Sequence, residues 1–443
     1  MNSGFTNNHS YGGFGDMFRE YKQLAAFFIL LWLASLYLPA ASPVSHSEIK
    51  RLTYSGNNVV GYPCLSDDGR LVLYTVEIKN GQESLMAVRI MNVDSGKETE
   101  LFRSGTMTAP APFEEIPLKV GSKPPVLSGN GQVAIFSLSL GEPKNILDHY
   151  LAVVNTDGTG LKVVSFPIDA LKDKDLEPLY FECAEWERVS NYTIDRKGTR
   201  AACLLKGHLG PRRYGNPCGI IFLDIPGLKQ RTILAPGFNG SEWVWPSIPR
   251  RPLLGGAWSF CLSGDGEKLV FGAQCSGEKT DYDLYLTDWE GQVLKRLTDF
   301  HDRWFSLADI DDEGKRVVFY YNGSKNQGMG TYMVNSDGTG LKYLESKVAP
   351  RIELFQLSGN GRFILFKHIY KGIILDLQTG KEMVAFDENT PGYARGLFPM
   401  DFPRLPAFWG PRIMSLKGNR ILLIGPPQGK ETPEIYMLEL GIE

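Results

Sequence analysis

One pattern of apolar and polar positions recurs seven times between about residue 60 and the C-terminus. Each copy has an apolar residue, a short polar residue, two variable positions, a glycine, two more positions and then three consecutive apolar residues, as in Leu262 to Phe271. The glycines of the seven copies are Gly69, Gly131, Gly198, Gly266, Gly314, Gly361 and Gly418. The short polar residue and the glycine suit a tight turn. The apolar run that follows is typical of a strand buried on both faces, so each copy predicts an inner β-hairpin.

A second hairpin follows most copies of the first. Residues 150–162 are nearly repeated as residues 332–342, and both segments contain Asp-Gly-Thr-Gly-Leu-Lys. Looser versions occupy residues 88–97, 284–295 and 374–381. Asp-Gly and Ser-Gly pairs between apolar runs indicate hairpin turns. Two hairpins give four strands, and four-stranded units repeated at roughly 40 to 60 residues are typical of propeller blades. We therefore predict an all-β, seven-bladed propeller with four-stranded antiparallel blades over residues 48–440.

The ends of the repeat region predict how the ring closes. The seventh copy supplies three strands, the last within residues 434–440, and lacks an outermost strand. Residues 48–54 contain Lys-Arg-Leu-Thr, the same four residues that close the fourth repeat at 295–298. We predict that this N-terminal strand completes the last blade, because closure removes two open sheet edges.

The first 47 residues do not follow the repeat. Residues 1–23 are polar, glycine-rich and about neutral, which predicts disorder. Residues 24–41 form an uncharged apolar run whose length lies between that of a signal-peptide core and that of a short spanning helix. We expect this segment to be a signal peptide or a signal anchor. The propeller would then be periplasmic or extracellular, and held at the membrane where the segment stays uncleaved.

Composition and charge narrow the classes of partner and chemistry. The 443 residues carry a formal net charge of −3, so no basic field predicts binding to nucleic acid. The six histidines include no paired ligand spacing and no nucleophile elbow occurs, so we predict no metal, no cofactor and no catalytic residue. The six cysteines lack a CxxC pair; we expect buried free thiols, with Cys203–Cys218 and Cys261–Cys275 as the alternative disulfides.

The acidic run from Asp309 to Gly314 resembles half of a calcium loop, but it lacks the downstream glutamate and stands where the other repeats have their inner turn. We interpret it as a turn.

Two stretches between repeats carry aromatic and arginine residues, at 238–258 and 392–409. Connections between blades cross one rim of a propeller, where such side chains could bind a ligand near the central channel. The alternative is that they only pack long loops against the blade edges. The candidate ligand-binding residues are Trp243, Trp245, Arg250, Arg251, Trp258, Arg395, Arg404 and Trp409.

The repeats resemble the TolB-type, WD40-like propeller repeats of bacterial envelope proteins, in which an apolar residue, Ser, an Asp- or Asn-containing pair and Gly precede a buried strand ending in Phe. The resemblance covers residues 48–440. It implies a rigid interaction platform, and we expect a monomer that binds an envelope protein or peptide without catalysis. The alternatives are a propeller that binds or cleaves acidic polysaccharides, and the gating propeller of a peptidase.

Overall fold

The computed structural model divides the chain into two compact units, residues 1–42 and 43–443, and every residue that it describes belongs to the second unit. The described residues are 49–53, 58–80, 83–110, 114–140, 148–166, 188–206, 218–234, 237–238, 243–244, 260–274, 282–291, 293–300, 305–321, 328–346, 355–368, 371–387, 390, 414–425 and 434–441. The predicted disordered segment 1–23 and the predicted signal segment 24–41 lie outside them. Within these ranges, no helix has the length and apolar character needed to span a membrane.

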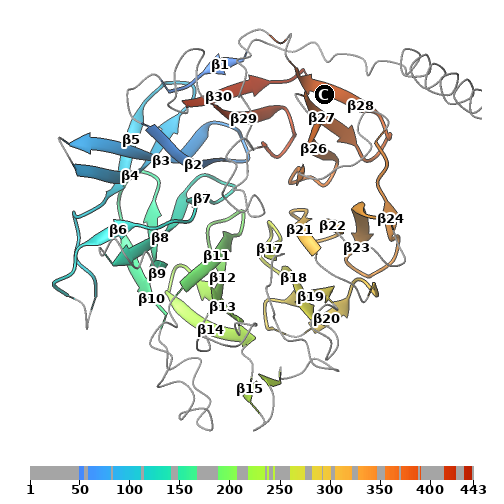
Figure 1. Ribbon diagram of the computed structural model, residues 1–443, viewed down its shortest axis with the longest axis horizontal. Helices are drawn as coiled ribbons and strands as arrows, with labels where there is room; N and C mark the ends of the chain where they lie inside the picture. Colours follow the sequence, from blue (N-terminus) through green and yellow to red (C-terminus); the bar gives the residue numbers. More distant parts are fainter. Residues whose placement is uncertain are drawn as a thin grey trace, which may run out of the picture. The chain divides into compact units, whose positions relative to one another are not determined.

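Seven antiparallel sheets form a ring, each contributing one blade (Figure 1). Blade 1 contains β2 (Asn58–Leu65), β3 (Leu71–Asn80), β4 (Glu83–Asn92) and β5 (Glu98–Arg103). Blade 2 contains β6 (Leu118–Val120), β7 (Val126–Leu127), β8 (Val133–Leu140), β9 (Asp148–Asn155) and β10 (Lys162–Ser165). Blade 3 contains β11 (Arg188–Ile194), β12 (Arg200–Lys206), β13 (Cys218–Asp224) and β14 (Lys229–Leu234). The predicted all-β, seven-bladed propeller is thus confirmed.

The remaining blades follow the same order. Blade 4 contains β17 (Phe260–Leu262), β18 (Lys268–Gln274), β19 (Tyr282–Asp288) and β20 (Val293–Arg296). Blade 5 contains β21 (Phe305–Ile310), β22 (Arg316–Tyr321), β23 (Gly330–Asn335) and β24 (Lys342–Tyr343). Blade 6 contains β25 (Phe355–Leu357), β26 (Phe363–His368), β27 (Lys371–Asp376) and β28 (Glu382–Phe386). Blade 7 contains β29 (Arg420–Gly425), β30 (Glu434–Glu439) and β1 (Lys50–Arg51), with a bridge from Met414 to Ile421 in place of an innermost strand.

Two local features depart from the predicted pattern. The innermost strand of blade 2 is split into β6 and β7, both paired with β8. Pro124 and Pro125 stand between the two pieces, and proline has no N–H to donate to a strand ladder. A short extra hairpin, β15 (Gly237–Phe238) with β16 (Trp243–Val244), lies in sequence between blades 3 and 4.

The inner turns have the conformation that the sequence predicts. All seven glycines have positive φ, between 63° and 76°. In blade 1, the Ser66 hydroxyl donates to the Asp68 carboxylate at 2.6 Å and accepts from the Leu71 amide at 2.9 Å. The same pair of bonds recurs at Ser128, Ser263 and Ser358. The repeated short polar residue therefore holds each turn closed.

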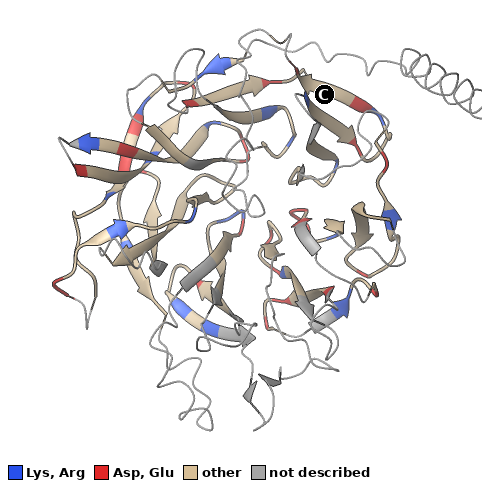
Figure 2. Ribbon diagram, viewed as in Figure 1, with Lys and Arg blue, Asp and Glu red and all other residues tan. Residues whose placement is uncertain are grey.

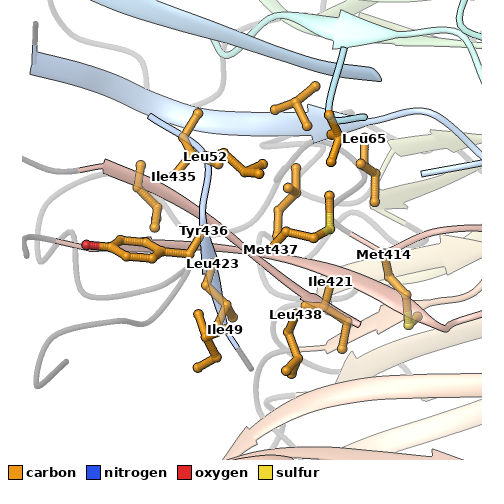
Figure 3. Packing of buried hydrophobic residues seen from close by; sticks show 14 of the residues in the cluster. Ile49, Leu52, Leu65, Met414, Ile421, Leu423, Ile435, Tyr436, Met437 and Leu438 are labelled. Atoms are coloured by element: carbon orange, nitrogen blue, oxygen red, sulfur yellow. The ribbon is translucent and has the colours of Figure 1, made fainter. Parts of the chain in front are cut away.

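The N-terminal strand closes the ring. β1 pairs antiparallel with β30, with Lys50 opposite Met437 and Arg51 opposite Tyr436. Ile49 and Leu52 are buried in a cluster that contains residues of β29 and β30, including Leu423 and Ile435 (Figure 3). The predicted completion of the last blade by residues near 48–54 is confirmed.

The two ends of the ring differ. In a four-stranded meander, the turns after the first and third strands lie at one end of the blade, which we call the turn end. The loops between the second and third strands and the connections between blades lie at the other, the loop end. In blade 1, the Val93 amide after the third strand donates to the Arg70 carbonyl of the inner turn at 2.8 Å, which places both turns together. The Leu440 amide likewise donates to the Asn419 carbonyl at 2.7 Å.

Candidate functional site

Backbone hydrogen bonds join the inner turns of neighbouring blades at six of the seven junctions at the turn end, and we call this circle of turns the turn ring. Six such bonds, each of 2.7 to 3.0 Å, connect blades 1–2, 2–3, 3–4, 4–5, 5–6 and 7–1. The donors and acceptors are Asp67 to Gly129, Asn130 to Arg196, Arg196 to Gly264, Asp265 to Asp312, Asp312 to Gly359 and Leu416 to Asp67. The turn ring therefore fixes the blades to one another close to the axis.

At one position of the turn ring, the residue types form a regular pattern when the blades are compared in order around the circle. This position is the residue directly after the short polar residue of each repeat. From blade 1 to blade 7 it is Asp67, Gly129, Arg196, Gly264, Asp312, Gly359 and Leu416. Charged residues thus alternate with glycines over six consecutive blades.

The three charged residues meet and form what we call the axial triad. The Arg196 Nε atom lies 2.6 Å from the Asp67 carboxylate, and its Nη1 atom lies 3.7 Å from the Asp312 carboxylate. Both aspartates are 7% exposed, whereas the Arg196 side chain is 43% exposed. Arg196 belongs to blade 3 and its two partners belong to blades 1 and 5, so its side chain links blades that are not neighbours.

The alternating glycines give the aspartates room. A Cβ atom at Gly129 would lie 2.2 Å from the Asp67 carboxylate, and one at Gly264 would lie 2.2 Å from that of Asp312. At Gly359 the separation from Asp312 would be 2.4 Å. Real Cβ atoms essentially never show distances below 3.0 Å, so glycine at these positions leaves the space that the two aspartates occupy.

A second set of charged residues joins a blade to the next at four of the seven junctions. The residue two positions after the turn glycine reaches forward to the following blade and donates to the carbonyl of its turn glycine. The pairs are Arg200 to Gly266 at 3.2 Å, Lys268 to Gly314 at 2.9 Å, Arg316 to Gly361 at 2.8 Å and Arg420 to Gly69 at 3.0 Å. The cations closest to the turn ring therefore serve contacts between blades.

The acidic run that resembles a calcium loop is a turn of this kind. The Asp311 carboxylate accepts the Lys315 amide at 2.6 Å, and Asp312 belongs to the axial triad. Burial raises the pKa of Asp311, although the bonds from the Lys315 and Arg316 amides oppose the rise. Among the residues that the structure describes, no group of three or more His, Cys, Asp or Glu side chains is arranged to hold a metal ion.

The sequence-predicted ligand residues are not brought together in the described part of the chain. Trp243 lies in β16, where its backbone pairs with Phe238. Trp245, Arg250, Arg251, Trp258, Arg395, Arg404 and Trp409 lie outside the described residues. Both stretches that carry these residues follow an outermost strand and precede the next innermost strand, so they start and finish at the loop end.

One tryptophan that sequence reasoning passed over is described. The Trp289 ring stacks on Phe222 of the neighbouring blade, with centroids 4.1 Å apart and an angle of 4° between the rings. The Arg200 guanidinium lies 4.8 Å from the Trp289 ring centroid. Trp289 therefore packs blades 3 and 4 against each other.

Three of the six cysteines are described with their side chains. Cys64, Cys203 and Cys261 are free thiols, as expected, and the first two are buried. Burial raises the pKa of Cys203 far above its ordinary value. Cys203 lies opposite Ile221 in the ladder, whereas Cys218 lies opposite Lys206, so the alternative Cys203–Cys218 disulfide does not form.

The fold and the turn ring define a class, the seven-bladed β-propellers, and comparison with solved structures agrees. An oligogalacturonate lyase in complex with manganese is 11% identical, covers 90% of this chain and 96% of its own, and superposes with a TM-score of 0.57. An oligogalacturonate lyase from Vibrio parahaemolyticus is 10% identical over 90% of this chain and 98% of its own, with a TM-score of 0.55.

A third similar structure is the β-propeller domain of the trilobed protease from Pyrococcus furiosus. It is 12% identical, covers 87% of this chain and 96% of its own, and has a TM-score of 0.50. Identities this low show the propeller fold alone. No protein-family model matches the chain, and no curated protein matches it in sequence.

Proposed function

We propose that this protein is a non-catalytic interaction platform whose loop end binds a protein or peptide of the cell envelope. The proposal rests on a difference in structure between the two ends of the ring. At the turn end, short turns are bonded to one another, and the charged side chains nearest the axis hold blades together. The strands that flank the two long connections end and begin at the loop end, and we expect the aromatic and arginine residues of these connections to form a binding surface there.

The charge distribution supports a partner bound by local contacts. Figure 2 shows Lys and Arg interspersed with Asp and Glu over the described strands, and the net charge of the chain is −3. No single-sign field over these strands would attract a polyanion. A partner is then held by specific side chains, among which Trp and Arg supply most binding energy at protein interfaces.

The location follows from the sequence alone and is part of the proposal. The apolar segment 24–41 exports the propeller or anchors it to the membrane, and the propeller acts in the periplasm or outside the cell. The resemblance of the repeats to TolB-type repeats of envelope proteins supports the same location.

The test is a capture experiment with two matched variants. The full chain would be incubated with envelope extract, and retained proteins would be identified and then titrated in purified form. Trp243→Ala combined with Trp245→Ala and Arg250→Ala changes the loop end, whereas Lys197→Ala combined with Lys417→Ala changes the turn end. We expect capture of a stoichiometric partner. Its affinity should fall at least tenfold for the first variant, a loss of about 1.4 kcal/mol or more, and should be unchanged for the second. Equal binding by both variants would contradict the proposal.

A carbohydrate-binding or lyase-like role is the second candidate. It is favoured by the two oligogalacturonate lyases, whose propellers match 90% of this chain, and by the Trp and Arg residues, which could stack on sugar rings and pair with acidic groups. An array of acidic and neutral glycans separates the two roles: binding to a glycan without a protein partner would replace the platform by a carbohydrate protein. The propeller of the trilobed protease supports a third role, the gating of a peptidase.

A further inference from the structure

The turn ring is narrow enough for side chains to fill it. Backbones joined by hydrogen bonds lie about 5 Å apart, so seven turns in a circle enclose a diameter of roughly 11 Å between backbone centres. That distance is about the outer diameter of one α-helix with its side chains. Because the backbone itself takes up part of it, a few side chains directed inward are sufficient to close the opening.

The axial triad supplies these side chains. A residue of blade 3 that contacts blades 1 and 5 must reach past blades 2 and 4. Because all the residues concerned lie in the inner turns, the Arg196 side chain lies at the axial opening of the turn end. Arg196 makes both contacts. The positions that it passes, in blades 2 and 4, are Gly129 and Gly264, where the space of a Cβ atom is occupied by the aspartates.

The seventh position adds an apolar contact. The Leu416 side chain lies 2.6 Å from where a Cβ of Gly359 would be, and Asp312 lies beside the same glycine. Side chains from blades 1, 3, 5 and 7 therefore converge over the glycines of blades 2, 4 and 6.

We infer that Arg196 is the keystone of a closed turn end: paired with Asp67 and Asp312, it blocks the ring there, so that ligands reach the axis from the loop end alone. The inference does not depend on which ligand binds. It bears directly on the peptidase alternative, because a propeller through which an extended peptide passes needs both ends open.

The first experiment replaces the keystone and a matched neighbour. Arg196→Gly gives blade 3 the residue that blades 2, 4 and 6 have at this position, and Lys197→Gly places the same flexible residue next to it without touching the triad. Backbone hydrogen exchange is then followed at the amides of Asp67, Asp265 and Asp312, which donate across blade junctions. We expect exchange to rise about tenfold or more at these amides in Arg196→Gly only, with no change at the outer turns near Gly96 and Gly338.

The second experiment measures how exposed the innermost strand of blade 4 becomes next to the turn ring. The Cys261 thiol is half-buried, three residues before Gly264, and lies 3.4 Å from the Asp309 carboxylate on the innermost strand of the next blade. Its modification by a small cationic thiosulfonate reagent is followed by mass spectrometry, with the buried thiols Cys64 and Cys203 as internal references. We expect several-fold faster modification of Cys261 in Arg196→Gly and unchanged protection of both references.

The possible outcomes separate closure from general loosening. Unchanged hydrogen exchange at the turn ring would overturn the inference; the rate at Cys261 does not decide alone, because the reagent also has access from the loop end. A rise in thiol modification that includes Cys64 and Cys203 would overturn it too, since the whole ring would then have loosened. Arg196→Met keeps much of the side-chain bulk without its charge, and covers the case in which the glycine variant does not fold. We expect it to raise hydrogen exchange at the turn ring while Cys261 is modified more slowly than in Arg196→Gly; equal behaviour to the unchanged protein in both measurements would refute the keystone role.

Discussion

Blades 4 and 7 end in the same outermost strand sequence, Lys-Arg-Leu-Thr, but they acquire it differently. In blade 4 it continues from β19 through a short turn, whereas in blade 7 it is β1, from the other end of the chain. The bonds are equivalent: the Leu284 amide donates to the Thr298 hydroxyl at 2.9 Å, and the Ile435 amide donates to the Thr53 hydroxyl at 2.9 Å. The same contact thus holds a covalently attached strand in blade 4 and a separate strand in blade 7. We call the Arg, Leu and Thr of this strand the lock: Arg296, Leu297 and Thr298 in blade 4, and Arg51, Leu52 and Thr53 in blade 7.

An arginine and a buried acid complete the lock in both blades. Arg296 pairs with Asp283, which is fully buried, and Arg51 pairs with Glu434, which is 2% exposed. The Asp283 carboxylate also accepts the Thr298 hydroxyl at 2.8 Å and the Phe300 amide at 3.0 Å. In blade 4 the turn from β19 also holds the outermost strand, so the lock is an additional contact. In blade 7 no such turn exists, and the lock closes the ring.

The largest expected effect comes from the buried leucine of the lock. Leu52→Ala and Leu297→Ala remove side chains that are 8% and 4% exposed, so each should lower the free energy of unfolding by about 2–4 kcal/mol. Denaturant unfolding measures this loss. Only Leu52→Ala should let its strand detach locally, because no turn tethers β1 to β30, and hydrogen exchange of the Ile435 and Met437 amides should then rise well above that of Leu284 and Leu286. Equal exchange in the two variants would mean that blade 7 is no weaker than blade 4.

The next effect tests the buried acids. Asp283→Asn and Glu434→Gln each remove the buried carboxylate that pairs with the arginine of the lock, although Arg296 keeps a contact with the exposed Asp299 at 2.7 Å. Loss of a buried pair typically costs about 3 kcal/mol. Thermal unfolding should show a similar loss in both, with a second, earlier transition for Glu434→Gln alone. Glu313→Gln, which removes an exposed pair with Lys315, is the control and should change stability little.

A smaller effect is expected where blade 7 meets blade 1. Gly69 and Gly96 both have positive φ, 72° and 67°, but a Cβ at Gly69 would lie 2.4 Å from Arg420 Cδ, whereas nothing lies within 4 Å of one at Gly96. Gly96→Ala should cost about 1 kcal/mol from backbone strain alone. Gly69→Ala should cost more, because Arg420 must move away from the junction. Equal midpoints in urea would show that the Arg420 contact contributes nothing.

The smallest effect is a dependence on pH that should leave the lock untouched. Burial alone would raise the pKa of Asp376 in blade 6, but hydrogen bonds from Arg362 and from the Gln378 and Thr379 amides outweigh it and hold the pKa below its ordinary value. A lowered pKa in the folded state means that this stabilisation is present above about pH 4, the ordinary value for Asp, and is lost as the pH falls through the folded-state pKa. Asp376→Asn should therefore lower the melting temperature by roughly a few degrees at pH 7 and progressively less below pH 4. A difference that stays constant down to pH 2 would count against this origin.

The fold could be predicted because its determinants are local. Each inner turn is specified within ten residues by a polar side chain that bonds the turn and a glycine with positive φ. Ring closure is long-range, yet it too could be predicted, because residues 50–53 repeat the sequence of residues 295–298.

The axial triad could not be found in the same way. Asp67, Arg196 and Asp312 occupy a position that varies from repeat to repeat, and aligning the repeats hides the fact that they meet. Its signal is the order around the circle, in which charged residues alternate with glycines. The aromatic and arginine residues of stretches 238–258 and 392–409 remain a prediction, since the sequence of these stretches follows no repeat.

The pairing of β1 with β30 also offers a different way to connect the chain. Lys50 lies opposite Met437, and the residue that follows β30 lies beside the inner turn of the same blade. Antiparallel partners with ends this close can be joined by a three-residue turn. A circular permutant could link Leu440 to Glu48 through Asp-Gly and begin in a loop elsewhere. The pairing of β1 with β30 would then be an ordinary hairpin, and blade 7 would consist of one continuous stretch of chain.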